Sequence, residues 1–191
     1  MTIDEIYEKL IQHMTKGLMF HEKLADYYDF LGLKGYKRCH EYRFFEETIK
    51  FRKVVKYYIN HYSKLPSETL IDSPKVIPAN WYSHIREDVD IQTKRNSVKT
   101  GIQLWKDWEI ETKKLYEQLF KELCELNDVS SSNMLSCLIC DVDKELKYVQ
   151  RKWLELKAID YDMKIIIPCQ QEIHDKYKKK MKELDLNVEC W

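Results

Sequence analysis

Two glutamates, Glu47 and Glu145, lie on the apolar stripes of two predicted helices. A carboxylate on a core-facing stripe is costly unless it is paired with a cation or bound to a metal. The sequence therefore predicts a buried centre where both carboxylates meet a positive charge. Lys50 follows Glu47 by three residues and Lys144 immediately precedes Glu145, so these lysines, or an arginine, are the candidates for a core ion pair.

The length and the charge balance favour a single domain without a strong electrostatic field. At 191 residues the chain can bury one sizeable core, and we expect one domain over residues 1–191. Lys and Arg together number 32, as do Asp and Glu, so the formal net charge is zero. We therefore expect neither nucleic acid nor an anionic membrane as a partner.

The N-terminal segment and the cysteines favour a cytoplasmic location. The first twenty residues carry acids and an amphipathic period instead of the basic start and apolar block of a signal peptide. No apolar run approaches the length of a membrane span. The six cysteines are scattered, unlike those of a secreted disulfide scaffold. Cys137 and Cys140 form a C-x-x-C without a second pair, and we expect them to be small core residues rather than zinc ligands.

Apolar residues recur at helical spacing in several long segments, so the chain is predicted to be all-α. The first helix runs from about residue 3 to 31 and the second from about residue 34 to 62. Because the link between them is short, these helices must be antiparallel neighbours. The stretch from residue 64 to 80 contains three prolines and no sustained period. It is long enough to cross a bundle from end to end.

The second half of the chain predicts another helical hairpin. A third helix begins between residues 81 and 98 and continues to Leu126, and a fourth carries its apolar stripe from Leu135 to Leu156. A fifth helical segment follows Asp160. Two hairpins joined by one long crossover are typical of a ferritin-like four-helix bundle, here with a C-terminal fifth helix, rather than of an up-down-up-down bundle with short loops.

Two stretches of the sequence resemble a known family. The residues Glu22–Tyr27, EKLADY, and the run LKGYKRCHEYRFFEETIKF from Leu33 resemble helices A and B of ferritins and bacterioferritins. In those helices a glutamate precedes Ala-x-Tyr, and the next helix carries Glu-Glu-x-x-His. The whole chain is also similar to ferritin-like proteins of Firmicutes and their prophages. The resemblance implies a fold, but it implies no reaction.

The resemblance also implies where a di-iron or di-manganese site would lie. Such sites take a glutamate from each of two helices and Glu-x-x-His from each of the others, because three residues rise only about 4.5 Å and keep both ligands on one metal. Glu22 matches the first-helix glutamate of the family, although His21 points more squarely at the predicted core. The candidate metal ligands are therefore Glu22, Glu47, Glu111, Glu145 and His21, with Glu109 as the alternative to Glu111.

The histidines of the metal motif are missing from both hairpins. Lys50 stands three residues after Glu47, and Tyr148 stands three residues after Glu145. A protonated ammonium cannot bind a metal, so Lys50 would substitute a fixed positive charge for that of the ion. His40 is on the same face as Glu47 but about 10.5 Å away along the helix, which is too far to share one ion with it.

Three functions remain open at this point. The first is a non-catalytic bundle without a cofactor that acts through protein–protein binding, for example as a prophage accessory protein that engages a host factor. The missing histidines and the basic, aromatic second helix favour it. The second is a metal-dependent oxidase or iron-handling protein with an altered, carboxylate-rich site. The third is a purely structural homo-oligomer, since ferritin-like bundles often pair through their first two helices.

Overall fold

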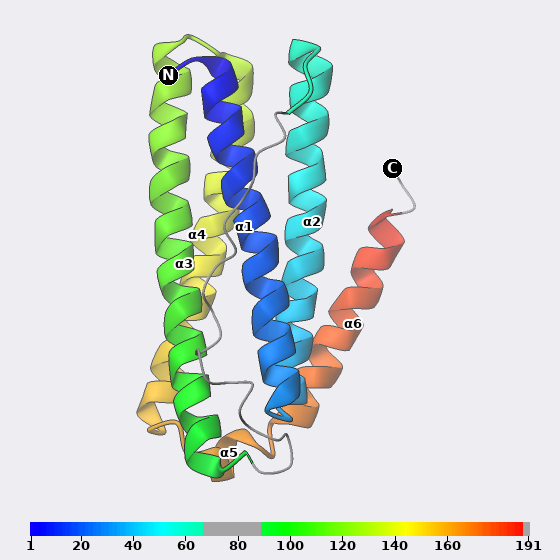
Figure 1. Cartoon of the computed structure of the whole chain (residues 1–191), viewed down its shortest axis with the longest axis vertical. Coiled ribbons are helices and arrows are strands. Elements are labelled where there is room, and N and C mark those ends of the chain that lie inside the picture. The colour runs from blue at the N-terminus through cyan, green and yellow to red at the C-terminus, as the bar shows by residue number, and fades with distance from the viewer. Residues whose placement is uncertain (67–88, 189–191) are drawn as a thin grey trace.

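Six helices make up the computed structural model of this protein, which describes residues 1–66 and 89–188 (Figure 1). The described residues contain no β-strand, so the predicted all-α class is confirmed. None of the described helices is both long and apolar enough to cross a membrane. The helices are α1 (Ile3–Phe30), α2 (Lys34–Tyr62), α3 (Ile91–Glu125), α4 (Val129–Ala158), the one-turn α5 (Met163–Ile166) and α6 (Gln170–Val188).

Local sequence signals set the ends of these helices. Thr2 begins α1 with a capping box, in which its hydroxyl accepts from the Glu5 backbone while the Glu5 carboxylate accepts from the Thr2 backbone. Gly32, with a φ of 70°, turns the chain from α1 into α2 in a conformation that glycine adopts without strain. The Asp90 side chain accepts from the Thr93 backbone and so caps α3.

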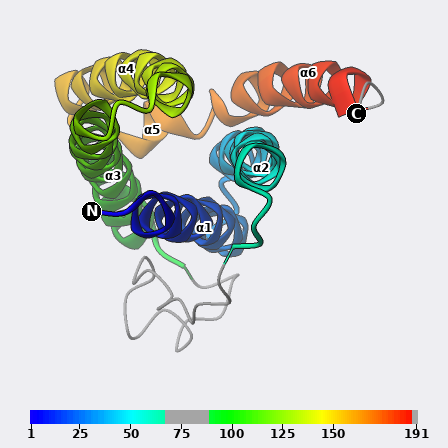
Figure 2. The ribbon, with the colours of Figure 1, turned by 90° about the horizontal axis from the view of Figure 1, so that it is seen from above.

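The four long helices form two antiparallel hairpins, α1–α2 and α3–α4, as predicted. α1 also packs against α3, whereas α2 and α4 do not pack closely against each other. α6 lies along the outside of α2 and diverges from the bundle (Figures 1 and 2). α2 ends at Tyr62 and α3 begins at Ile91, and most of the predicted crossover at 64–80 lies outside the described residues.

The apolar core consists of two clusters stacked along the bundle. The upper one is packed around Tyr7, Leu119 and Leu135, and the lower one around Tyr28, Trp105 and the α6 residue Tyr177. Along each long helix the two clusters are separated by a stretch that contributes to neither. Between the clusters lies a belt at mid-height whose residues belong to neither of them.

Candidate functional site

A cluster of charged side chains occupies this belt. α2 contributes most of it, because residues spaced by three, four and seven positions share one helix face. α3 and α4 each add one glutamate. The cluster, called here the charged centre, consists of Arg43, Glu46, Glu47, Lys50, Glu109 and Glu145.

Arg43 links the two hairpins across the open side of the bundle. Its Nη1 donates to Glu145 Oε1 at 2.5 Å and to Glu46 Oε2 at 2.7 Å, and only 6% of its side chain is exposed. Although burial opposes the charged form, the attraction of Glu145 and Glu46 raises the pKa of Arg43 above its usual value. The guanidinium therefore supplies a permanent positive charge between α2 and α4.

Lys50 supplies the second positive charge. Its Nζ lies 2.7 Å from Glu47 Oε1, with 18% and 24% of the two side chains exposed. Burial lowers the pKa of Lys50, but Glu47, Glu46 and Glu145 together outweigh burial and raise it overall. Lys144, the other predicted core cation, is exposed and pairs with Asp141 instead. Arg43 takes the place at Glu145 that the sequence analysis gave to Lys144.

Glu109 is the third-helix glutamate of the charged centre. It is buried, and its Oε1 accepts from the indole Nε1–H of Trp105 at 2.9 Å. Burial, followed by the nearby Glu47 carboxylate, raises the pKa of Glu109 to about 8, so it is mostly protonated at neutral pH. The expected choice of Glu111 is wrong, because Glu111 is exposed on another face of α3.

The first-helix residues lie apart from the charged centre. Glu22 is exposed, so α1 presents no carboxylate at the position that the resemblance implied. His21 is buried, and its Nδ1 lies 3.0 Å from His40 Nδ1, with Trp105 against both rings. Burial lowers the pKa of both imidazoles, that of His40 to about 3, so the pair is neutral. The sequence analysis did not predict that these two histidines bond to each other.

The two cysteines of the C-x-x-C motif do not belong to the core. Both Cys137 and Cys140 are exposed on α4, which corrects the expectation that they are core residues. The buried stripe of α4 instead follows Leu135, Leu138 and Val142. The cysteines lie outside this stripe because helical spacing turns them toward solvent.

These side chains do not fit a di-iron or di-manganese centre. Arg43 and Lys50 already hold the carboxylates of Glu145 and Glu47, and burial raises the pKa of Glu109, which favours its neutral form. At the second histidine position, the hydroxyl of Tyr148 is hydrogen-bonded to that of Tyr177 at 2.6 Å. Within residues 1–66 and 89–188, no group of three or more His, Cys, Asp or Glu side chains has an arrangement that could hold a metal ion.

Comparisons with known proteins establish the fold. No family model matches the chain, and no curated protein matches its sequence. A humanized archaeal ferritin matches with a TM-score of 0.75 and 15% identity over 90% of this chain and 94% of that one. An engineered closed form of the Archaeoglobus fulgidus ferritin has a TM-score of 0.74 and 15% identity over 91% and 96%. The open pore ferritin of that archaeon has a TM-score of 0.72 and 16% identity over 89% and 93%. The chain therefore has the ferritin-like four-helix fold with a C-terminal helix.

Replacing Lys50 with methionine tests the ion pair between Lys50 and Glu47. We expect the free energy of unfolding to fall by about 3 kcal/mol, because the largely buried Glu47 carboxylate would lose its counter-charge. Urea unfolding followed by circular dichroism measures the change. Lys144→Met removes an exposed lysine with the same three-residue spacing to an acid, and it should have little effect. A loss below about 1 kcal/mol for Lys50→Met would mean that water solvates Glu47.

Proposed function

We propose that this protein is a non-catalytic ferritin-like bundle that acts by binding another protein rather than by oxidising iron. The bridge from Arg43 to Glu145 and Glu46 is the observation that carries this proposal. The bridge places a buried guanidinium among the carboxylates that a metal would need, and Lys50 places an ammonium on Glu47. Both cations repel an incoming metal ion and occupy its ligands.

The outer surface of α2 supports the binding role. Arg52, Lys53 and Lys56 are exposed there, and 47% of the Phe45 side chain is exposed on the same helix. Basic side chains beside an exposed aromatic ring suit a partner protein with acidic and apolar groups. A prophage accessory that engages a host factor remains our specific prediction for such a role.

Iron handling is the second candidate function. Its support is the convergence of Glu47, Glu109 and Glu145 from three different helices, together with the ferritin fold of the chain. A metal ion could bind there only if it displaced Arg43 and Lys50 and ionised Glu109. We therefore rank this function below protein binding.

Metal analysis decides between these two candidates. We expect protein purified without chelator, loaded with Fe(II) or Mn(II) and passed through gel filtration, to retain no stoichiometric metal and to show no ferroxidase activity. Carboxylates that lack imidazole partners favour hard ions, so they would not select iron. Two equivalents of iron retained by the wild-type chain, and lost in Glu47→Ala and Glu145→Ala, would promote iron handling to first place.

A gain-of-function variant shows whether the metal assay can detect a site in this bundle. The triple change Arg43→Leu, Lys50→His and Tyr148→His removes the guanidinium and creates Glu-x-x-His on both α2 and α4. We expect this variant to bind more Fe(II) than the wild-type chain.

A purely structural homo-oligomer is the third candidate function. The molecular mass of the protein in solution would show whether two chains pair.

A further inference from the structure

A cavity of about 370 Å³ lies below the charged centre. It lies where α2 and α4 do not pack closely, and α6, which packs along α2 (Figure 2), forms part of its wall. Cavities of this size bind small organic molecules in many proteins. Its walls carry aromatic and aliphatic side chains from all six described helices, including Tyr28, Tyr36, Trp105, Tyr148, Ile166 and Ile173.

The inner part of the cavity is uncharged. His40 lies there as a neutral imidazole, and its hydrogen bond to His21 satisfies Nδ1. The hydroxyl groups of Tyr148 and Tyr177 bond to each other, which leaves their rings as apolar walls. An ionic group would lose its hydration here without gaining a charged partner, so the inner part suits an apolar body.

The rim of the cavity carries both lysine and glutamate side chains. Lys152 and Lys176 line it, and Arg151 and Lys180 lie within 6 Å of the tyrosine rings that form the wall. Of the rim acids, Glu155 pairs with Lys152 at 2.6 Å and with Arg151 at 3.8 Å. The other acid of the rim is Glu172, so the lining itself carries two lysines and two glutamates, and Arg151 and Lys180 lie just outside it.

Lys176 is the cation best placed to meet a ligand. Its Nζ lies 5.8 Å from the centre of the Tyr148 ring and 5.5 Å from that of Tyr177, directly over the wall of the cavity. In the described part of the chain it forms no ion pair. Burial, and then the repulsion from Lys180, Lys152 and Arg151, lowers the pKa of Lys176, as expected in a field that favours an anion.

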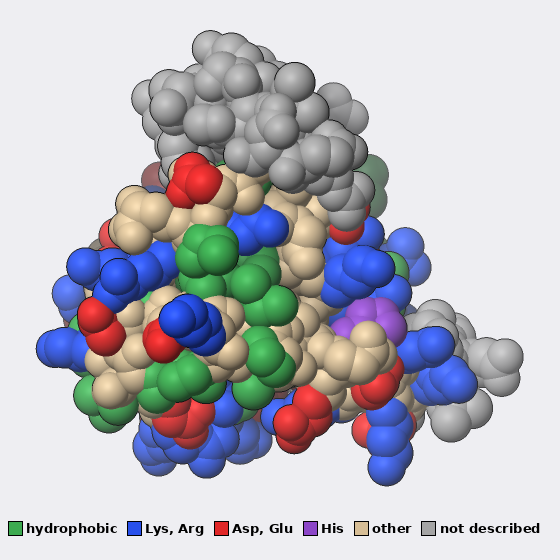
Figure 3. Space-filling view, turned by 90° about the horizontal axis from the view of Figure 1, so that it is seen from below, with side chains coloured by type: hydrophobic (Ala, Val, Ile, Leu, Met, Phe, Trp, Pro, Cys, Tyr) green, Lys and Arg blue, Asp and Glu red, His purple; other side chains and the backbone are tan. Residues whose placement is uncertain are grey.

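We propose that this cavity binds a small amphipathic carboxylate, with its apolar body among the aromatic rings and its carboxylate at Lys176. At roughly 30 Å³ for each water-sized group, the cavity holds about a dozen non-hydrogen atoms, which is the size of a medium-chain fatty acid. Seen from this lower end, hydrophobic side chains gather among Lys, Arg and acidic side chains (Figure 3). The cavity-lining Ile165 is 47% exposed. This binding goes beyond the proposed function and does not depend on it.

Titration of the intact protein with decanoate, compared with decanol, tests the proposal. We expect decanoate to bind with one-to-one stoichiometry in calorimetry and to shift the NMR signal of the Trp105 indole N–H, since that ring lines the cavity. Decanol has the same chain without the charge, and it should bind about fivefold more weakly. The proposal is overturned if decanoate does not bind at about 1 mM, if both bind equally, or if binding leaves Trp105 unchanged.

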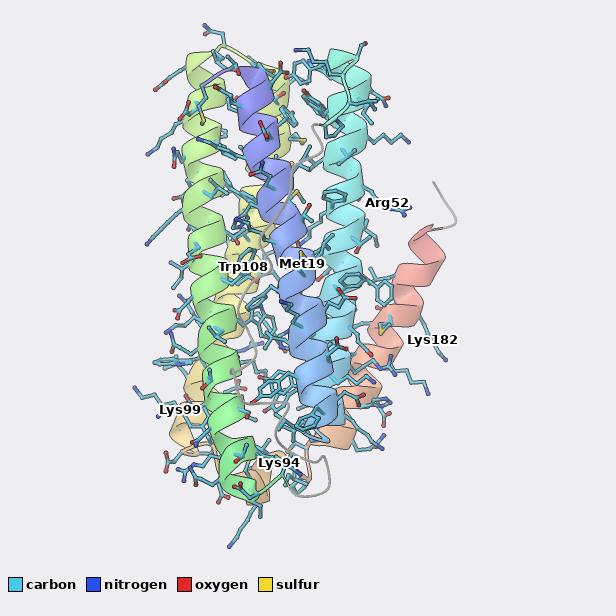
Figure 4. The ribbon with its side chains drawn as sticks, viewed as in Figure 1. Met19, Arg52, Lys94, Lys99, Trp108 and Lys182 are labelled. Atoms are coloured by element: carbon cyan, nitrogen blue, oxygen red, sulfur yellow. The ribbon has the colours of Figure 1, made fainter. Side chains whose placement is uncertain are left out.

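Three variants locate the two parts of the site. Ile173→Trp fills the cavity and should abolish binding of both compounds. Lys176→Ala removes an exposed side chain, and it should weaken decanoate about fivefold without affecting decanol. Lys182→Ala is the matched control, because Lys182 projects away from the bundle on the same helix (Figure 4). Equal loss in the two lysine variants would refute a specific role for Lys176, and circular dichroism verifies that each variant is folded.

Discussion

Replacing Arg43 with methionine is expected to lower the free energy of unfolding by about 3 to 5 kcal/mol, the cost of removing one partner from a buried ion pair. Arg43 is the link between Glu46 on α2 and Glu145 on α4. Without the guanidinium, both carboxylates would remain desolvated and would repel each other. Urea unfolding by circular dichroism measures the loss as a lower midpoint at an unchanged slope.

A combined variant separates the cost of an unpaired charge from the net contribution of the ion pair. Arg43→Met with Glu46→Gln and Glu145→Leu replaces the whole network by neutral groups, and we expect it to recover most of the stability lost in Arg43→Met. Arg52→Met is the matched control, because Arg52 projects from α2 into solvent (Figure 4). If Arg43→Met is no more destabilising than Arg52→Met, the network contributes nothing and solvent satisfies Glu145.

The architecture was predictable from the sequence because long helices leave a strong periodic signal. Gly32 and the prolines near residues 64 to 80 separate the periods, so the two hairpins follow from the chain order. The existence of a charged centre was predictable for the same reason. A glutamate such as Glu47, which interrupts an apolar stripe, needs a partner inside the protein.

The membership of the charged centre was harder to predict. The sequence analysis allowed an arginine as the partner of the two glutamates but did not single out Arg43, since most arginines are exposed. Its position four residues before Glu47 places it on the same helix face, and that spacing was the available signal. Glu111 was preferred over Glu109 because counting back from the turn at Ser130 placed it near the level of Glu145, although the helical angle slightly favoured Glu109. An error of one or two residues in a helix rotates a side chain away from the core.

The cavity could not have been found from the sequence. It depends on the gap between α2 and α4 and on the angle at which α6 packs against α2, and neither quantity leaves a periodic signal in the sequence.

The comparison with ferritins does not predict the chemistry of the site either. A shared fold fixes where helices lie, whereas chemistry depends on which side chains face one another. In this chain, Lys50 and Tyr148 stand where the resemblance implied histidines.

Replacing Glu109 with glutamine is expected to stabilise the protein at alkaline pH and to flatten the dependence of its stability on pH. The native pKa of about 8 is above the usual value of 4.5, so the folded state keeps a proton that the unfolded state loses. The stability that follows from protonated Glu109 is fully present below pH 4.5, and it is lost as the pH rises to about 8. At 1.36 kcal/mol for each unit of pKa shift, that loss is roughly 5 kcal/mol.

Urea unfolding of the wild type and of Glu109→Gln between pH 5 and pH 9 measures the effect as a difference between the two proteins. Glutamine can still accept from the Trp105 indole, so the hydrogen bond is preserved while the titration is removed. Titration of the buried histidines cancels in the difference because both proteins carry them. Glu111→Gln is the control, since it removes an exposed carboxyl from the same helix and should retain the wild-type pH profile. If the difference in unfolding free energy between the two proteins does not change with pH, Glu109 is ionised throughout this range. The charged centre would then contain one more negative charge that needs a positive partner.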